Sequence, residues 1–342
     1  MKVLLQKSAR SNTSWLKLTC LALVLVFAGC KKDHDPTLTI TTVATGLVTP
    51  IGIEADKYGN IWVCETGTAH NDGKVIVIKK NGTKYDAIVN LSSFVAEISG
   101  EIHGPAHLLL DGHMLYILAG DYLYKADISG FKPGDTPLDA TTIPYEDIAS
   151  FVLAYPFVNN AHDTHPYNLT KGPDGDLYIA DAGANAIIHR KSAGVYSVLA
   201  EVPGFANPTP VGPPQVQAVP TSIMYDGHNF LVTTLTGFPF PSGKARIYKI
   251  SMSGAVSLYQ DGFTTLVDIA EGNYGGRLVV QHAIFGPMGF TPNTGSLVWA
   301  NGTTSTELAG GLNLPIGIKQ LNHYTWYVTS IGDGTVLKVT YK

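Results

Sequence analysis

The sequence predicts an all-β fold, a six-bladed β-propeller, from three observations. A unit of strand, tight turn and strand recurs six times along the chain, and the composition favours strands and turns over helices. The last unit ends one strand short, while a strand-like segment before the first unit belongs to none of the neighbouring units. Repeats of roughly 40–50 residues with several short strands each are typical of propellers.

Composition narrows the class of protein before any motif is considered. Of the 342 residues, 45% are hydrophobic and only 15% charged, with 36 Gly and 20 Pro, a balance that suits strands and tight turns. The net charge of −4 provides no basic surface, so no nucleic-acid partner is expected. We expect one propeller domain over residues 38–342, and a monomer.

Residues 1–30 are interpreted as a lipoprotein signal peptide. The apolar run at 18–28 follows a basic leader and is too short to span a bilayer. It ends in Ala28-Gly29-Cys30, which resembles a bacterial lipobox whose cysteine is lipidated; an ordinary cleaved signal is the alternative. Residues 31–37 then form a charged tether. These features predict an exported protein, anchored in the outer or cytoplasmic membrane and facing the periplasm or the cell surface.

Only one cysteine, Cys64, lies beyond this leader, so the body of the protein has no partner for an intrachain disulfide. Cys64 lies in the strand-like run Ile-Trp-Val-Cys, where it is expected to be a small buried apolar residue.

The clearest repeat runs from residue 165 to 185. A strand begins at Pro166, Asp174-Gly175 forms the turn, and a second strand leads to Asp181. An Asp-Gly pair between two β-prone runs is a strong hairpin signal. The first strands of the six units begin at Pro50, Pro105, Pro166, Pro220, Leu266 and Pro315, between 46 and 61 residues apart.

Insertions account for the longer spacings. Ile148, Phe151, Val152 and Tyr155 have helical spacing, which predicts a short surface helix. The segments 205–214 and 285–294 are expected to be irregular loops. Third and fourth strands follow in most units, but the sixth ends with its third strand at 336–341. Residues 38–44 supply the missing strand if the ring closes on itself, which would remove two sheet edges.

Three segments resemble the ScyD/ScyE family: 163–168, the run Asp-Ala-Gly-Ala-Asn at 181–185, and above all Leu-Thr-Gly-Phe-Pro-Phe-Pro at 235–241. The resemblance covers about residues 46–338. It implies an exported propeller related to NHL and SMP-30 repeats, and it carries no settled activity. The chain departs from the family pattern at His165 and Asn168 and in the turn of the fifth unit.

Propeller geometry predicts which side chains meet. The first strand of each blade starts, and the second ends, at the same face of the ring, and such mouths are common ligand sites. The candidates at this mouth are the third residues of the first strands, Gly52, His107, Asn168, Ser222, Asp268 and Gly317, and the second-strand ends Glu65, Asp181, Thr236 and His282. Phe238 belongs to an aromatic loop expected at the same mouth.

Two kinds of metal site are compatible with these residues. Asn168 and Asp268 offer oxygen ligands suited to Ca²⁺, together with Glu65 and Asp181. The histidines at 103, 107, 162 and 165, with Asp163, would suit Zn²⁺ or a transition metal instead. Every one of these side chains also has a structural interpretation, as a loop hydrogen-bonding group or a turn cap. Asp268 interrupts an apolar strand, so its charge needs a partner.

The sequence favours a membrane-anchored propeller that binds an unknown small molecule or envelope protein, without catalysis. The alternative is a Ca²⁺-dependent lactonase or hydrolase resembling SMP-30 proteins, with its metal on Asn168 and Asp268 and Asp181 or a histidine as base. A sugar or quinone-linked oxidoreductase is a third possibility, for which no cofactor motif is present.

Overall fold

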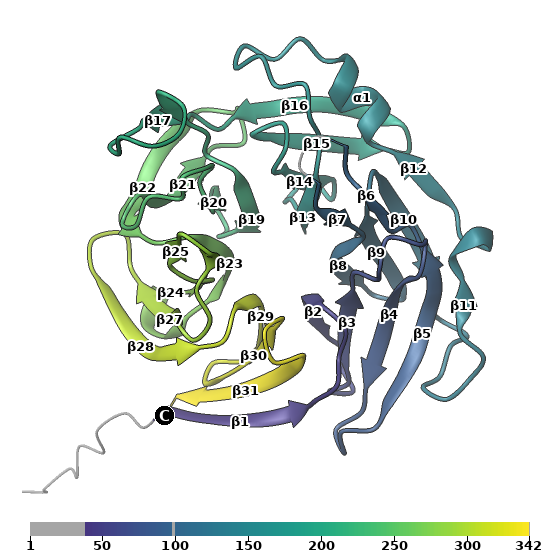
Figure 1. Cartoon of the computed structure of the whole chain (residues 1–342). Coiled ribbons are helices and arrows are strands. Elements are labelled where there is room, and N and C mark those ends of the chain that lie inside the picture. Colours follow the sequence, from purple (N-terminus) through teal and green to yellow (C-terminus); the bar gives the residue numbers. More distant parts are fainter. Residues whose placement is uncertain (1–37, 98–99, 342) are drawn as a thin grey trace, which may run out of the picture. The chain divides into compact units, whose positions relative to one another are not determined.

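The structure, a computed structural model, describes residues 38–97 and 100–341. These residues form six β-sheets of four or five strands, arranged around a common centre as the blades of a propeller (Figure 1). The predicted fold class is therefore confirmed. Each blade runs outward from an inner strand that faces this centre.

The first three blades follow one another along the chain. Blade 1 contains β2 (Pro50–Ala55), β3 (Ile61–Glu65), β4 (Gly73–Ile78) and β5 (Lys84–Leu91). Blade 2 contains β8 (Pro105–Asp111), β9 (Met114–Ala119), β10 (Tyr122–Asp127) and β12 (Tyr145–Asp147). Blade 3 contains β13 (Pro166–Lys171), β14 (Leu177–Asp181), β15 (Ala186–Ser192) and β16 (Val195–Glu201).

The remaining blades repeat the arrangement. Blade 4 contains β19 (Pro220–Tyr225), β20 (Phe230–Thr234), β21 (Ala245–Ile250) and β22 (Val256–Phe263). Blade 5 contains β23 (Leu266–Glu271), β24 (Arg277–Gln281), β27 (Gly295–Ala300) and β28 (Ser305–Leu312). Blade 6 contains β29 (Pro315–Asn322), β30 (Thr325–Ser330), β31 (Thr335–Tyr341) and β1 (Leu38–Ala44).

The strand β1 closes the ring as its outermost strand in blade 6. It pairs antiparallel with β31, with Leu38 opposite Tyr341 and Ile40 opposite Val339. Figure 1 shows the two ends of the described chain lying side by side in this blade. The predicted closure by an N-terminal strand is confirmed, and it satisfies the outer edge of β31.

The hydrophobic core is divided into six clusters, one between each pair of neighbouring blades. Each sheet is therefore buried on both faces, which explains why strands such as β3 and β14 are buried at every position. Cys64 of β3 is fully buried in the cluster between blades 1 and 2, and burial raises the pKa of its thiol.

The hairpin turns follow the Asp-Gly signal. Gly175 has φ +86°, a conformation that an L-residue adopts at a cost, and the Asp174 carboxylate accepts the backbone N–H of Asp176. In blade 5 the same connection is the 3-10 turn η2 (Asn273–Gly275), where Tyr274 takes a positive φ of 55°.

The insertions are more ordered than the sequence predicts. The helix α1 (Ala149–Ala154) forms where helical spacing occurs. The two segments expected to be irregular carry short ladders instead, β17 (Phe205–Ala206) with β18 (Gln215–Val216), and β25 (Phe285–Gly286) with β26 (Gly289–Phe290). A third ladder pairs β6 (Phe94–Val95) with β7 (Ile102–His103). The backbone N–H and C=O groups of these loops need hydrogen-bond partners, and each two-residue ladder supplies them.

One insertion leaves its own blade. The strand β11 (Leu138–Asp139) pairs parallel with β5 of blade 1, and the chain returns through the 3-10 turn η1 (Ala140–Thr142) to β12 of blade 2. Within the described residues no helix combines the length and hydropathy needed to cross a membrane.

Candidate functional site

The inner strands bring four polar side chains to the centre of the ring. They come from the third position of each inner strand in blades 2 to 5, and they are His107, Asn168, Ser222 and Asp268, all buried. The matching positions in blades 1 and 6 are glycines because no side chain fits there. A Cβ on Gly52 would lie 2.5 Å from the Ala106 carbonyl oxygen, and one on Gly317 would lie 2.3 Å from that of Ile51.

Asp268 is the centre of this group. Its Oδ1 accepts hydrogen bonds from Ser222 Oγ at 2.6 Å, from the Ile269 N–H at 2.8 Å and from Asn168 Nδ2 at 3.3 Å. Its Oδ2 accepts the N–H of Ile318 at 2.7 Å. The side chain is 6% exposed, and these partners are what a charge buried in an apolar strand requires. The carboxylate therefore joins blades 3, 4, 5 and 6.

Asn168 contacts Asp268 through its amide nitrogen. The same Nδ2 donates to Ser222 Oγ at 2.9 Å. In this arrangement Asn168 orients the carboxylate, and it would offer its oxygen to a metal ion only after the amide rotated.

His107 holds the one unusual atom of the group. Its Nδ1 lies 2.8 Å from the Tyr167 carbonyl oxygen, which can only accept, so the proton of this ring belongs on Nδ1. Its Nε2 is then a lone pair that is buried without a hydrogen-bond partner, 3.6 Å from Asp268 Oδ2. A lone pair facing a carboxylate at this distance is unfavourable, so a proton on Nε2 or a cation between the two atoms would stabilise the pair.

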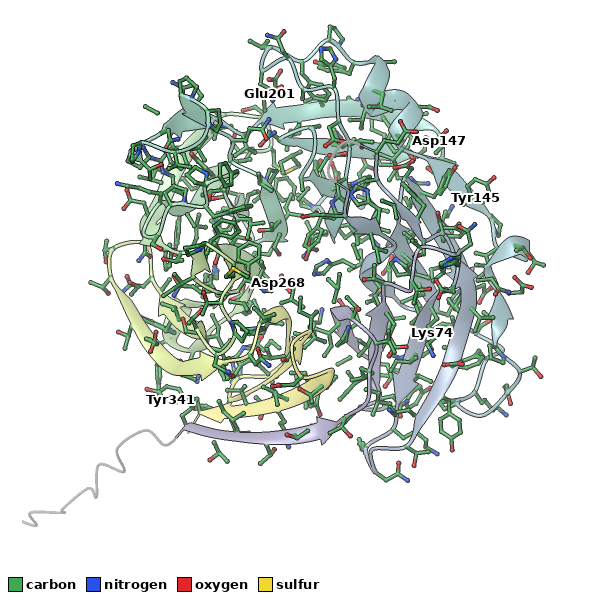
Figure 2. The ribbon with its side chains drawn as sticks, viewed as in Figure 1. Lys74, Tyr145, Asp147, Glu201, Asp268 and Tyr341 are labelled. Atoms are coloured by element: carbon green, nitrogen blue, oxygen red, sulfur yellow. The ribbon has the colours of Figure 1, made fainter. Side chains whose placement is uncertain are left out.

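A cavity of about 290 Å³ opens beside these residues. It is lined by the second halves of the inner strands, including His107, Asn168 and Asp268. Figure 2 shows Asp268 at the inner end of its blade. Two further residues line the cavity from blades 1 and 6, where Lys319 Nζ lies 2.6 Å from Glu54 Oε1. Glu54 is 6% exposed, and burial raises the pKa of its carboxyl, partly opposed by Lys319.

Neither Glu54 nor Lys319 was predicted from the sequence as a site residue. The usable signal is the two-residue period of a strand, because Glu54 and Lys319 each follow a central glycine by two positions and so face the same side. Their pairing joins residues 265 apart in sequence and closes the polar surface between blades 1 and 6.

The candidates at the second-strand ends line a different part of the molecule. Asp181 is fully buried within blade 3, where it accepts the N–H groups of His165 and Ala184 and the hydroxyl of Thr164. Burial raises the pKa of Asp181 to about 6. Glu65 accepts the Val48 N–H at 2.7 Å and pairs with Lys74 at 3.2 Å. Neither carboxylate lines the cavity beside Asp268.

His282, Thr236 and Phe238 also lie away from that cavity. The Nδ1 of His282 lies 3.0 Å from the Pro315 carbonyl oxygen, and its ring packs against Phe290. Thr236 is buried with its hydroxyl unpartnered. Phe238 is 47% exposed in the loop after β20, 6.1 Å from the ring of Phe285.

Two of the remaining candidate histidines, His103 and His165, stack between blades 2 and 3, whereas His162 is exposed. His103 and His165 are parallel with ring centroids 3.7 Å apart, and Tyr167 lies between His165 and His107. Burial lowers the pKa of both stacked rings, that of His165 to about 3, so both are neutral at physiological pH. Neutral rings can stack without the repulsion of two imidazolium charges.

Among residues 38–97 and 100–341, one group of three acidic or histidine ligand atoms lies within 4.8 Å, formed by Asp174, Asp176 and His189. It lies at the turn between β13 and β14 of blade 3, where His189 Nε2 of β15 is 2.8 Å from Asp176 and 3.8 Å from Asp174. The Asp174 carboxylate already accepts the Tyr178 hydroxyl at 2.6 Å. This group is an acidic cluster that could hold an ion, separate from the candidates named from sequence.

Solved structures with the same fold support the architecture. The chain is similar to the PQQ-bound aldose sugar dehydrogenase of Streptomyces coelicolor, with 12% identity, 90% of this chain and 98% of that chain covered, and a TM-score of 0.60. A gluconolactonase of Xanthomonas campestris gives 7% identity, 89% and 90% coverage and a TM-score of 0.56. Virginiamycin B lyase of Staphylococcus aureus gives 15% identity, 90% and 99% coverage and a TM-score of 0.50.

Neither a protein-family model nor a curated protein sequence matches the chain. At these identities the similar structures establish the fold alone, a six-bladed β-propeller.

Proposed function

We propose that the protein is a divalent-cation-dependent hydrolase that opens a small polar ester, such as a sugar lactone, in its central channel. The observation that carries this proposal is the unpartnered Nε2 of His107, buried 3.6 Å from a carboxylate oxygen of Asp268 beside a cavity of about 290 Å³. Propeller enzymes among the similar structures, the gluconolactonase in particular, support a catalytic role over a scaffold.

The residues at the centre fit a cation. Two ligand atoms bound to one divalent ion at about 2.1 Å each are commonly about 3–3.6 Å apart, which the His107 and Asp268 atoms match. His107 would supply nitrogen, Asp268 and Ser222 oxygen, and a mixed set of this kind suits Mn²⁺ or Zn²⁺ better than Ca²⁺. Ca²⁺ remains the expectation if Asn168 turns its oxygen inward. A bound cation would act as a Lewis acid on the ester carbonyl.

Glu54 is the group that would move a proton. Its carboxylate lines the same cavity and has its pKa raised by burial, which strengthens it as a base. Lys319 fixes its orientation at 2.6 Å. We assign Glu54, in preference to Asp181, as the acceptor of the proton from the attacking water, since Asp181 is occupied by three hydrogen bonds within its own blade.

A panel of sugar lactones with Mn²⁺, Zn²⁺ or Ca²⁺ tests the proposal on the chain from Thr37 onward. Glu54→Gln and His107→Ala should each lower kcat/KM at least roughly 100-fold, the usual effect of removing an acid–base group. Asp111→Asn, which breaks an exposed ion pair with Lys171, is the matched control and should keep full activity. Turnover unchanged in Glu54→Gln, or turnover only with PQQ and a sugar, would refute the assignment.

The second candidate is a binding or scaffold propeller without catalysis. It is favoured by exposed apolar side chains beside the aromatic loop, where Phe238 is 47% exposed, Ile284 48% and Met288 99%. Such a surface suits an envelope-protein partner. Absence of hydrolysis with every cation, combined with partner capture that Phe238→Ser abolishes, would establish this function in place of the first.

We also propose that the propeller is an exported, monomeric lipoprotein of ScyD/ScyE type. Support comes from the lipobox-like Cys30 with its tether at 31–37, which lie outside the described residues, and from the specific run at 235–241. Metabolic labelling with palmitate should mark the wild type and not Cys30→Ser. Label retained in Cys30→Ser would refute lipidation at this cysteine.

A further inference from the structure

A second cavity lies between blades 1 and 2, away from the central group. It has a volume of about 630 Å³ and is lined by four aromatic rings, Phe94, Tyr122, Tyr124 and Tyr145, by Asp121, and by the polar side chains of Asn71, Asn90, Ser92 and Thr141. None of the candidates discussed above lines it.

Strand register explains why the tyrosines meet. Tyr122 and Tyr124 are two positions apart on β10, so they share one face of the sheet. Tyr145 of β12 lies directly opposite Tyr124. The ring of Tyr145 is 5.0 Å from that of Tyr122 and 5.6 Å from that of Tyr124, at interplanar angles of 70° and 42°. The three rings therefore form a corner of tilted walls.

The wall opposite this corner comes from the segment that leaves blade 2. The strand β11 pairs with β5 of blade 1, and the η1 turn after it places Ala140 and Thr141 at the cavity. Figure 1 shows β11 outside β5, at the edge of the molecule. A four-stranded blade can close without this detour, so the segment adds a wall between two blades that the propeller itself does not need.

The charge of the cavity is negative and uncompensated. No Lys, Arg or His lines it, and the carboxylate of Asp121 makes no hydrogen bond or ion pair within the described chain. Burial, Asp147 and Asp163 raise the pKa of Asp121, in that order, so the charges that act on this carboxyl are those of other acids. Asp147 itself accepts the Ser150 N–H in the first turn of α1 at 2.9 Å. Figure 2 labels Tyr145 and Asp147 on the same blade edge.

We propose that this cavity binds an organic cation, a quaternary ammonium or a methylated amine. Aromatic rings attract such cations through their negative faces, and several rings set at angles to one another surround a rounded ammonium group. Asp121 supplies the opposite charge. A quaternary ammonium needs no hydrogen bonds, so the rings and the Asp121 carboxylate are enough to hold it. A neutral sugar would instead favour one flat exposed ring surrounded by paired polar groups.

Calorimetry with choline and tetramethylammonium tests the proposal. It uses the unit from Pro36 to Lys342, which is compact by itself. The wild type should bind both, and bind choline at least roughly tenfold more tightly than 3,3-dimethyl-1-butanol, the uncharged isostere. Tyr145→Ala and Asp121→Asn should each weaken choline binding roughly tenfold. Tyr145 is 59% exposed, so its replacement leaves the core intact.

Two controls make the result decisive. Tyr145→Phe keeps the ring and should retain affinity within roughly twofold. Tyr58→Ala removes a tyrosine that is 68% exposed in another hollow between the same blades, and should leave affinity unchanged. No binding of either cation, equal binding of the uncharged isostere, or binding that Tyr145→Ala and Asp121→Asn leave intact would overturn the proposal. Displacement of choline by cellobiose would also overturn the proposal.

Discussion

Removing the Asp268 carboxylate should weaken the propeller as a whole, because this one group accepts hydrogen bonds from three other blades. In Asp268→Ala, Ser222 and Asn168 can still bond to each other, but the buried N–H groups of Ile269 and Ile318 lose their acceptor. Each buried unsatisfied donor costs about 1–3 kcal/mol, so the free energy of unfolding should fall by about 2–6 kcal/mol.

That loss is large against the total stability of a domain, about 5–15 kcal/mol. For a chain of this length it corresponds to a decrease in Tm of roughly 3–10 °C. The assay is thermal denaturation followed by circular dichroism, performed in EDTA so that no bound cation contributes.

Two variants complete the experiment. Asp268→Asn keeps one acceptor oxygen, so its free energy of unfolding should fall less than that of Asp268→Ala. Asp111→Ala breaks an ion pair whose carboxylate is 42% exposed, and such pairs contribute about 0–1 kcal/mol. A Tm for Asp268→Ala within about 2 °C of that of Asp111→Ala would refute the claim that the central carboxylate holds the blades together.

Three further predictions use other buried groups. The pKa of Asp181 is raised to about 6 in the fold, so the folding stability that its protonated carboxyl contributes is present at low pH and is lost as pH rises towards 6. Asp181→Asn should therefore flatten the profile of Tm against pH between pH 4 and 6. An unchanged profile would contradict the shift. Lys319→Met leaves Glu54 buried without its cation, so Tm should fall more steeply than in wild type as pH rises from about 4 to 7; a parallel profile would contradict the pairing. Cys64 should not react with a thiol reagent until the chain unfolds, because burial keeps the thiol protonated and inaccessible, and rapid native labelling would contradict this.

The blades could be predicted from sequence because their causes are local. The strand–turn–strand units, the Asp-Gly turns and the unpaired strand at Leu38–Ala44 each show within a short window, and the structure places all of them as expected. The path of β11 could not be predicted, since nothing local tells a two-residue strand to pair with the preceding blade.

The site could be predicted only in part from the sequence, for a similar reason. The third position of each inner strand identified His107, Asn168 and Asp268, because a period of two fixes which side chains face the centre. Whether a carboxylate at a strand end faces that centre or caps its own blade depends on side-chain direction, which spacing does not determine. Asp181 caps its own blade. Glu54 faces the cavity, and its pairing with Lys319 depends on ring closure.

The measurement that tests the central claim most directly is the metal content of the propeller after equilibration with Mn²⁺ or Zn²⁺. One tightly held ion per chain should remain in the wild type and in His189→Ala, which removes a member of the cluster formed by Asp174, Asp176 and His189. The ion should be lost in His107→Ala and in Asp268→Asn. An ion retained in His107→Ala and lost in His189→Ala, or no ion in the wild type, would contradict a cation site at the centre of the ring.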